Sequence, residues 1–225
     1  ELYSRLPIPD IICQTFQMKH ILASILLLVL LFPALALGTT IDDLVETDGL
    51  YYKKFSDVPF TGKTTGGRQG AFKYGKKVGL WVAYHTNGRV FRKGTYEDGK
   101  EVGPWVSYYK NGQLGSKGNW EDGKKDGPWV GYYDKGQSEH KGTYEDGKKV
   151  GPWVHYHENG QVWMKGTYKN GKRVGPWVTY HGTGKVDNKG TYKDGKQDGP
   201  WVTYTVTGAV LEMYTGTYKN GVKVK

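Results

Sequence analysis

Aromatic and apolar residues recur along this chain in short runs that alternate with polar residues, and the pattern repeats every 24 residues. Three positions keep the period without a break. They hold Trp (Trp81, Trp105, Trp129, Trp153, Trp177 and Trp201), Tyr (Tyr84, Tyr108, Tyr132, Tyr156, Tyr180 and Tyr204) and Gly (Gly79, Gly103, Gly127, Gly151, Gly175 and Gly199). A fixed period of this length indicates a repeat protein in which each copy is one supersecondary unit.

Each copy contains two turn signals, typified by Asn111-Gly112 and Asp122-Gly123. Both dipeptides favour type I′ turns, because Asn, Asp and Gly tolerate positive φ. No segment after residue 44 shows a helical period long enough to compete. We therefore predict an all-β fold, a repetitive antiparallel meander of consecutive β-hairpins that forms an elongated, twisted single-layer sheet. The hairpin repeats are expected over residues 70–225 and a divergent N-terminal cap over residues 39–69.

The turn also predicts which residues lie opposite each other. With Asn111-Gly112 as a two-residue loop, Tyr109 faces Leu114 and Trp105 faces Gly118. The ring of Trp105 is then expected to cover the bare backbone of Gly118. Ladders of Trp, Tyr and Val or Leu along this face would replace a globular core, and stability should add up repeat by repeat.

The opposite face is the predicted binding face. Each repeat contains a Lys-Gly pair, such as Lys117-Gly118. This Lys is expected to lie directly opposite Val and diagonal to Tyr, with its aliphatic stem along the Tyr ring. The ammonium groups would form a row about 10 Å apart, suited to an acidic surface. The candidate binding residues are Tyr108, Lys117, Tyr132, Lys141, Tyr156, Lys165, Tyr180 and Lys189.

The charge of the chain is consistent with that partner. Lys and Arg outnumber Asp and Glu by 32 to 22, which gives a formal net charge of +10. The excess is spread through every repeat, so it favours acidic partners without indicating nucleic acid.

The N-terminal part resembles a secretory signal peptide over residues 18–38. Met18-Lys19-His20 is a short basic start, an apolar run from Ile21 to Phe32 follows, and small residues lie around Ala36 and Gly38. We expect a signal helix here, export to the cell envelope or beyond, and no structural role for the upstream extension, residues 1–17. An uncleaved membrane anchor is the alternative. The only cysteine, Cys13, precedes this segment, so no disulfide framework is expected.

No motif indicates catalysis, a cofactor or a metal centre. Gly94–Lys100 fits G-x-x-x-x-G-K, but Glu101 stands where a phosphate loop needs Ser or Thr. His155 and His157 are expected to share a face and to bind a metal weakly at most, since no carboxylate or Cys recurs with them. The column of His85, His157 and His181 also holds Tyr109, Tyr133 and Thr205, which suggests a tolerant surface position. We expect a chain that is not an enzyme.

The pattern G-x-W-x-x-Y-x-x-N-G-Q-x-x-x-K-G-x-Y-x-x-G-K resembles the MORN-type repeat, the membrane occupation and recognition nexus, over about residues 47–225. It is most similar to the bacterial variant found in YwqK-family antitoxin-like proteins, whose leader resembles Pro59–Lys63. The resemblance implies a twisted single-layer sheet of hairpins, a scaffold or binding role without catalysis, and in the antitoxin setting a toxin protein as partner.

Three kinds of function stay open at this point, beside the interpretation that the aromatic residues serve only the packing of the sheet and that the function lies in the genomic context. The first is an exported protein-interaction module, the second is envelope or glycan binding through exposed aromatic rings, and the third is contact with lipid headgroups through the Lys column. Trp exposure separates the first two, because buried Trp ladders leave no ring for a sugar to stack on. The sequence leaves the oligomeric state open.

We predict that the mature protein begins between Leu37 and Thr39 and leaves the cytoplasm. The signal-like segment from Met18 to Gly38 is the reason. N-terminal sequencing of the purified protein measures this. Retention of Met18 in a soluble cytoplasmic pool would contradict it.

Overall fold

The computed structural model describes residues 38–225. The expected upstream extension and the signal segment with its helix lie outside the described residues, apart from Gly38. The chain divides into two units, Glu1–Gly38 and Thr39–Lys225, and the second is described below. Within the described range, no helix is long and apolar enough to cross a membrane.

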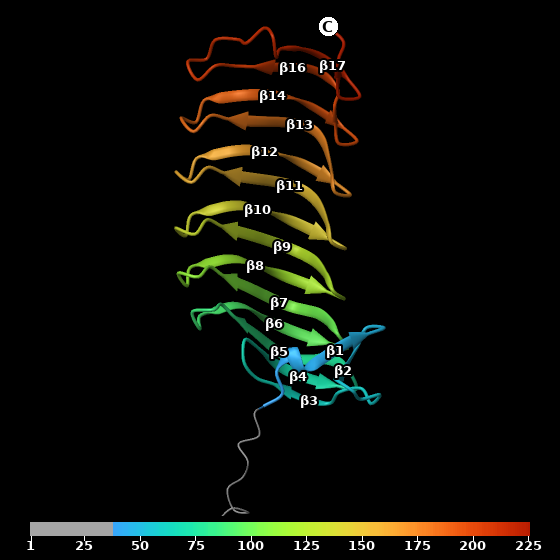
Figure 1. The fold of residues 1–225 in the computed structure, drawn as a ribbon. Helices are drawn as coiled ribbons and strands as arrows, with labels where there is room; N and C mark the ends of the chain where they lie inside the picture. The colour runs from blue at the N-terminus through green and yellow to red at the C-terminus, as the bar shows by residue number, and fades with distance from the viewer. Residues whose placement is uncertain (1–37) are drawn as a thin grey trace, which may run out of the picture. The chain divides into compact units, whose positions relative to one another are not determined.

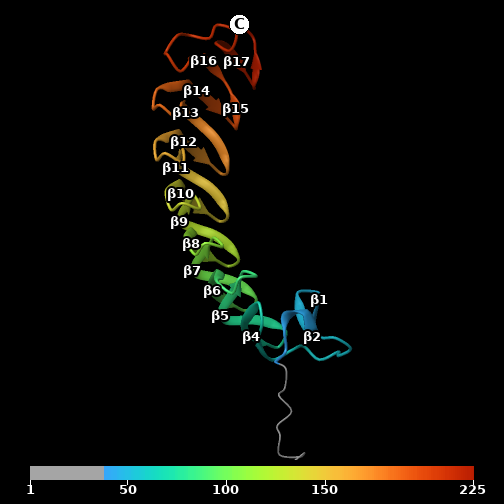
Figure 2. The same ribbon diagram turned by 60° about the vertical axis from the view of Figure 1, so that its left-hand side comes forward.

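The second unit is an open antiparallel meander, as predicted, and consecutive strands follow one another along the sheet (Figure 1). A 3-10 turn, Ile41–Asp43, leads into a separate hairpin of β1 (Leu44–Thr47) and β2 (Leu50–Lys53). The 16-stranded sheet then starts with β3 (Gly62–Thr64), β4 (Arg68–Lys73), β5 (Lys76–Tyr84), β6 (Val90–Glu97), β7 (Lys100–Tyr108), β8 (Leu114–Glu121), β9 (Lys124–Tyr132) and β10 (Ser138–Glu145). It ends with β11 (Lys148–Tyr156), β12 (Val162–Lys169), β13 (Lys172–Tyr180), β14 (Val186–Lys193), β15 (Lys196–Gln197), β16 (Gly199–Thr203), β17 (Gly216–Lys219) and β18 (Val222–Lys223). The strands lie in a single layer that bends along its length (Figure 2).

The two turns of a repeat differ, and only one was predicted correctly. Asp122 and Gly123 both have positive φ, 52° and 80°, and Glu121 pairs with Lys124, as a type I′ turn requires. The Asn-Gly turn is instead a three-residue loop in which Gly112 has a φ of 91° and Asn111 keeps a negative φ. Its Asn111 side chain accepts a hydrogen bond from Gln113 N at 2.9 Å, which holds the residue in this conformation.

The longer loop moves the pairing near the turn and leaves the distant pairing unchanged. Leu114 lies opposite Tyr108, and not opposite Tyr109 as predicted. Gly115 then bulges out of β8, which offsets the extra loop residue. Beyond the bulge Trp105 faces Gly118, as predicted.

The Trp residues lie on bare backbone, but each ring covers a different glycine from the one expected. The ring of Trp105 lies on Gly94 of the preceding strand, where a Cβ would meet Trp105 Cδ2 at 2.0 Å. Gly118 is covered by Trp129, since a Cβ at this glycine would lie 2.3 Å from Trp129 Cδ2. A bulge at Gly127 and Pro128 brings Trp129 opposite Gly118. The pairing predicted from one hairpin alone did not include this second neighbour.

Aromatic rings form a continuous ladder that serves as the core of the sheet. Each Trp of the 24-residue period is between 0% and 6% exposed. Neighbouring rings meet edge to face, for example Tyr96 with Trp105 at 5.2 Å and Tyr144 with Trp153 at 5.1 Å between centroids. Cations cover the outer side, such as Lys149 Nζ at 4.0 Å from the Trp153 ring centroid. We call the side of the sheet that carries these rings the Trp face.

The N-terminal end of the ladder is closed by the region predicted as a cap. Leu44, Phe60, Phe72 and Trp81 form one buried cluster. Phe72 meets Trp81 edge to face at 5.0 Å, so the cluster continues directly into the ladder.

We predict that Trp153→Ala lowers the free energy of unfolding by about 3 kcal/mol or more, because the ring is fully buried. Trp163→Ala is the matched control, since that ring is 45% exposed, and it should cost less than about 1 kcal/mol. Urea unfolding followed by circular dichroism measures both. Equal losses in the two variants would contradict the ladder as the source of stability.

Candidate binding faces

The structure places the predicted Lys residues as a row on the side opposite the Trp face. Lys117 lies directly opposite Val106 on one neighbouring strand and Val130 on the other, as predicted. Lys141, Lys165 and Lys189 hold the equivalent register, and all four side chains are exposed. We call this side, with its Tyr, Val and Lys columns, the Lys-Tyr face.

For three of these Lys residues, the tyrosine that the side chain contacts belongs to the following hairpin. Lys141 Nζ lies 5.5 Å from the ring centroid of Tyr156, and not over Tyr132 as the predicted pairing had it. Lys165 over Tyr180 and Lys189 over Tyr204 repeat the contact at 5.5 Å. A register shift between Ser138 and His140 separates Lys141 from Tyr132, whereas β10 and β11 pair regularly from His140↔His155 to Lys141↔Val154. The predicted residues therefore share a face, and the contacts link neighbouring hairpins.

The Trp face carries a second row of cations that the sequence analysis missed. Lys125, Lys149 and Arg173 lie over the rings of Trp129, Trp153 and Trp177 at 4.1, 4.0 and 4.7 Å. Burial lowers the pKa of Lys125 and of Lys149. These three residues stand two positions after the Gly of the second turn, on the same side of the strand as the Trp four residues later, and this was a usable signal although Glu101 and Gln197 hold the same position in other repeats.

Two histidines meet on the Trp face. His140 and His155 lie opposite each other on β10 and β11, with ring centroids 5.6 Å apart, and both stack on Trp153. Burial, helped by the charge of Lys149, lowers the pKa of His155 to about 4. His157 was expected beside His155 as a weak metal ligand, but its Nε2 lies 2.9 Å from the carbonyl oxygen of Tyr180. Across residues 38–225 no group of three or more His, Cys, Asp or Glu side chains is placed to hold a metal ion.

At its His and Tyr positions, the column shared by His, Tyr and Thr links the repeats and is not a tolerant surface position; among the described residues, the Thr205 side chain bonds only within its own loop. Tyr109 and Tyr133 each donate a hydrogen bond of 2.6 Å, to the carbonyl oxygens of Tyr132 and Tyr156. His85 Nε2 lies 2.8 Å from the carbonyl oxygen of Tyr108. His and Tyr share this column because both reach a backbone acceptor in the next repeat.

Four segments of the chain match the family model of the MORN repeat variant: 77–98, 101–122, 149–170 and 173–194. These matches support a MORN-type repeat protein, and repeats of this kind generally serve as interaction modules. No curated protein matches the chain. One solved structure, "Crystal structure of GtfA/B complex bound to UDP and GlcNAc", aligns with 61% of this chain at 11% identity and a TM-score of 0.18. The alignment spans 25% of that chain, and so weak a likeness indicates nothing about this protein.

We predict that His155 titrates near pH 4 in the folded protein. An unfolded His titrates near 6.5, so the unfolded state binds more protons between these values, and stability should fall as the pH drops through that window. His155→Thr, which installs the residue found at Thr179, should reduce this pH dependence. NMR titration of the imidazole and unfolding at several pH values measure the two effects. A His155 midpoint near 6.5 would contradict its burial against Trp153.

Proposed function

We propose that this chain is an exported, non-catalytic repeat scaffold that binds a partner protein with an acidic surface through the Lys-Tyr face. The observation that carries the proposal is the row of exposed Lys residues, three of which lie over a Tyr ring at the same distance of 5.5 Å. A cation held over an aromatic ring loses less side-chain entropy when a partner arrives.

The spacing of the row supports an extended contact with the partner. Equivalent strands lie two strand spacings apart, so the ammonium groups repeat at about 10 Å. This is close to the Debye length of about 8 Å at physiological salt, so neighbouring charges act partly together and attraction should weaken as salt rises. Asp126 and Asp198 lie on the same side by register, in a column that elsewhere holds Val. They make the surface less positive near those two hairpins.

The alternative partners either fit the structure less well or are supported by fewer observations. Sugar stacking needs free ring faces, and the Trp rings of the 24-residue period are at most 6% exposed; Trp163, which is 45% exposed, stands in a column that holds no other Trp. Lipid headgroups or anionic envelope glycans would use the same Lys row, and they are separate outcomes of the test below. A toxin as the partner follows only from the resemblance to YwqK-family antitoxin-like proteins.

We predict that changing Lys117, Lys141, Lys165 and Lys189 together to Gln lowers capture of partner protein from envelope extract about fivefold or more at low salt. The matched control changes Lys148, Lys172, Lys193 and Lys196 to Gln, which removes the same charge at the turn edge. Quantitative pull-down at low and physiological salt measures both, beside binding to anionic vesicles.

An equal effect of the two sets of substitutions would mean that net charge alone drives capture. Unchanged capture by the first variant would leave the Lys row with only a role in solubility. Loss of vesicle binding without loss of protein capture would favour the headgroup alternative.

A further inference from the structure

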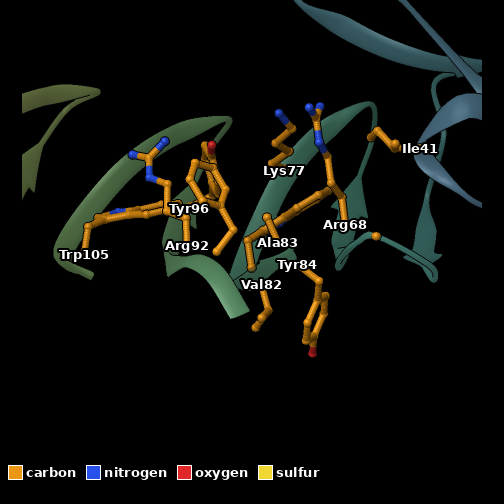
Figure 3. Close-up of a pocket in the computed structure, with 12 residues that line it drawn as sticks. Ile41, Arg68, Lys77, Val82, Ala83, Tyr84, Arg92, Tyr96 and Trp105 are labelled. Atoms are coloured by element: carbon orange, nitrogen blue, oxygen red, sulfur yellow. The ribbon is translucent and has the colours of Figure 1, made fainter. Parts of the chain in front are cut away.

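The Trp face has a hollow at its N-terminal end, outside the Lys-Tyr face. The pocket has a volume of about 350 Å³ and includes Arg68, Lys77 and Arg92 among its lining residues. These three side chains rise on one side of the strands, while Val82 and Tyr84 point to the other side (Figure 3). The volume lies at the lower end of the range of about 300–1,000 Å³ that small-molecule sites occupy.

The hollow exists because a small residue stands between two arginines. Arg68 of β4 lies opposite Ala83 of β5, and Ala83 lies opposite Arg92 of β6. The two arginines therefore flank Ala83 on strands about 10 Å apart. Later repeats place larger residues at the Ala83 position, such as His155 and Thr179. The one smaller residue there, Gly131, lies beneath the ring of His140.

The positive charge of the hollow is poorly compensated. Among the described residues, Arg68 forms no ion pair and its guanidinium donates no hydrogen bond. Lys77 lies over the rings of Tyr51, Trp81 and Tyr96 at 5.0 to 5.4 Å and forms no ion pair within residues 38–225, and burial lowers its pKa.

The acidic groups nearby are Glu101 and Glu46. Glu101 lies 3.7 Å from Arg92 and accepts a hydrogen bond from Tyr96 at 3.2 Å. The charge of Glu46 partly opposes the lowering of the Lys77 pKa by burial, but Glu46 forms no ion pair with Lys77. Three cations therefore face two carboxylates in a partly enclosed space, and a bound anion would complete the balance.

We propose that this pocket binds a small organic carboxylate, with the carboxylate at the guanidinium group of Arg68 and the apolar part over Ala83. The Arg92 guanidinium lies 4.0 Å from the Trp105 ring centroid and adds positive charge at the far side of the pocket. Planar guanidinium groups match the two oxygens of a carboxylate, and such charge-assisted hydrogen bonds are the strong ones. The apolar part of the ligand contacts Ile41, Trp81 and Phe91, which also line the pocket. This site is independent of partner binding by the Lys-Tyr face.

The test uses benzoate as the probe and the full chain as the protein. Isothermal titration and ¹H–¹⁵N NMR should show benzoate binding that weakens with added NaCl, and no comparable binding of benzyl alcohol, the uncharged analogue. Arg68→Gln should weaken benzoate binding about tenfold or more, because it removes the guanidinium group that holds the carboxylate. Ala83→Leu should abolish it by filling the floor without changing charge.

The matched control is Lys93→Gln, which removes one charge next to Arg92 on the opposite face and should leave benzoate binding within about twofold. The fourfold Lys variant of the Lys-Tyr face should also bind benzoate normally, so failure of one proposal does not imply failure of the other. Thermal unfolding checks that each variant folds. If Ala83→Leu does not fold, Arg68→Gln decides the test, because that side chain is exposed and forms no ion pair.

Three results would overturn the proposal. One is unchanged benzoate binding in Arg68→Gln or in folded Ala83→Leu. Another is equal binding of benzyl alcohol or of inorganic phosphate, which would mean an apolar or an unselective anionic surface. The last is binding to phosphatidylserine vesicles that needs Arg68 while benzoate does not bind at all, which would assign the hollow to a headgroup.

Discussion

The structure depends on the contact between an indole ring and the bare backbone of a glycine. At Gly94, Gly118, Gly142 and Gly166 a Cβ would lie 2.0 to 2.3 Å from the indole Cδ2 of the Trp on the next strand, so no other residue fits without displacing the ring. A single-layer sheet has no second layer to bury its side chains, and a ring lying flat on backbone is a way to exclude water within one layer. Edge-to-face aromatic rings and stacked cations then cover remaining sides of these rings, as at Trp153. This explains how the Trp residues are buried in a structure without a globular core.

The same contact makes the repeats mutually dependent. The two rows of turns add further links between neighbouring repeats, which are ion pairs in one row and hydrogen bonds in the other. At the Asp-Gly turns, Lys100 pairs with Asp122 at 2.6 Å and Lys124 with Asp146 at 2.5 Å. At the Asn-Gly turns, Asn111 donates to the carbonyl oxygen of Asp134 at 2.6 Å. The exposed ion pairs contribute little individually, but they fix the distance between successive turns. Every link joins a repeat to its nearest neighbour, which is the condition for stability to add up along the chain.

The architecture could be predicted from the sequence because it follows from the 24-residue period and from the alternation of side chains between the two faces of each strand. Neither depends on predicting every turn correctly. Trp105 faces Gly118 even though the turn between them was predicted wrongly, since the extra loop residue and the bulge at Gly115 cancel. What failed needed information from outside one hairpin. The glycine under the Trp105 ring lies in the preceding hairpin, and the Tyr that Lys141 contacts and the acceptor of Tyr109 lie in the following one. A pattern read within one repeat shows which face a residue is on, and it leaves undecided which neighbour the residue touches.

Internal repetition also separates positions that the fold needs from positions that it leaves free. The Trp and the Gly beneath it do not vary along the ladder, because each is fitted to the other. The row that crosses the Trp face through Arg92, Ser107, Ser116, Gly131, His140, His155, Met164 and Thr179 changes at nearly every strand, although its members are paired as regularly as the rest. The fold therefore sets the place of this row without setting its chemistry. It is cationic and hollow beside Ala83, where two arginines flank a methyl group, and filled by stacked imidazoles beside Trp153. A scaffold whose strands are nearly identical can thus differ in chemistry along its length, and in this row a cavity opens where Ala83 stands between two arginines.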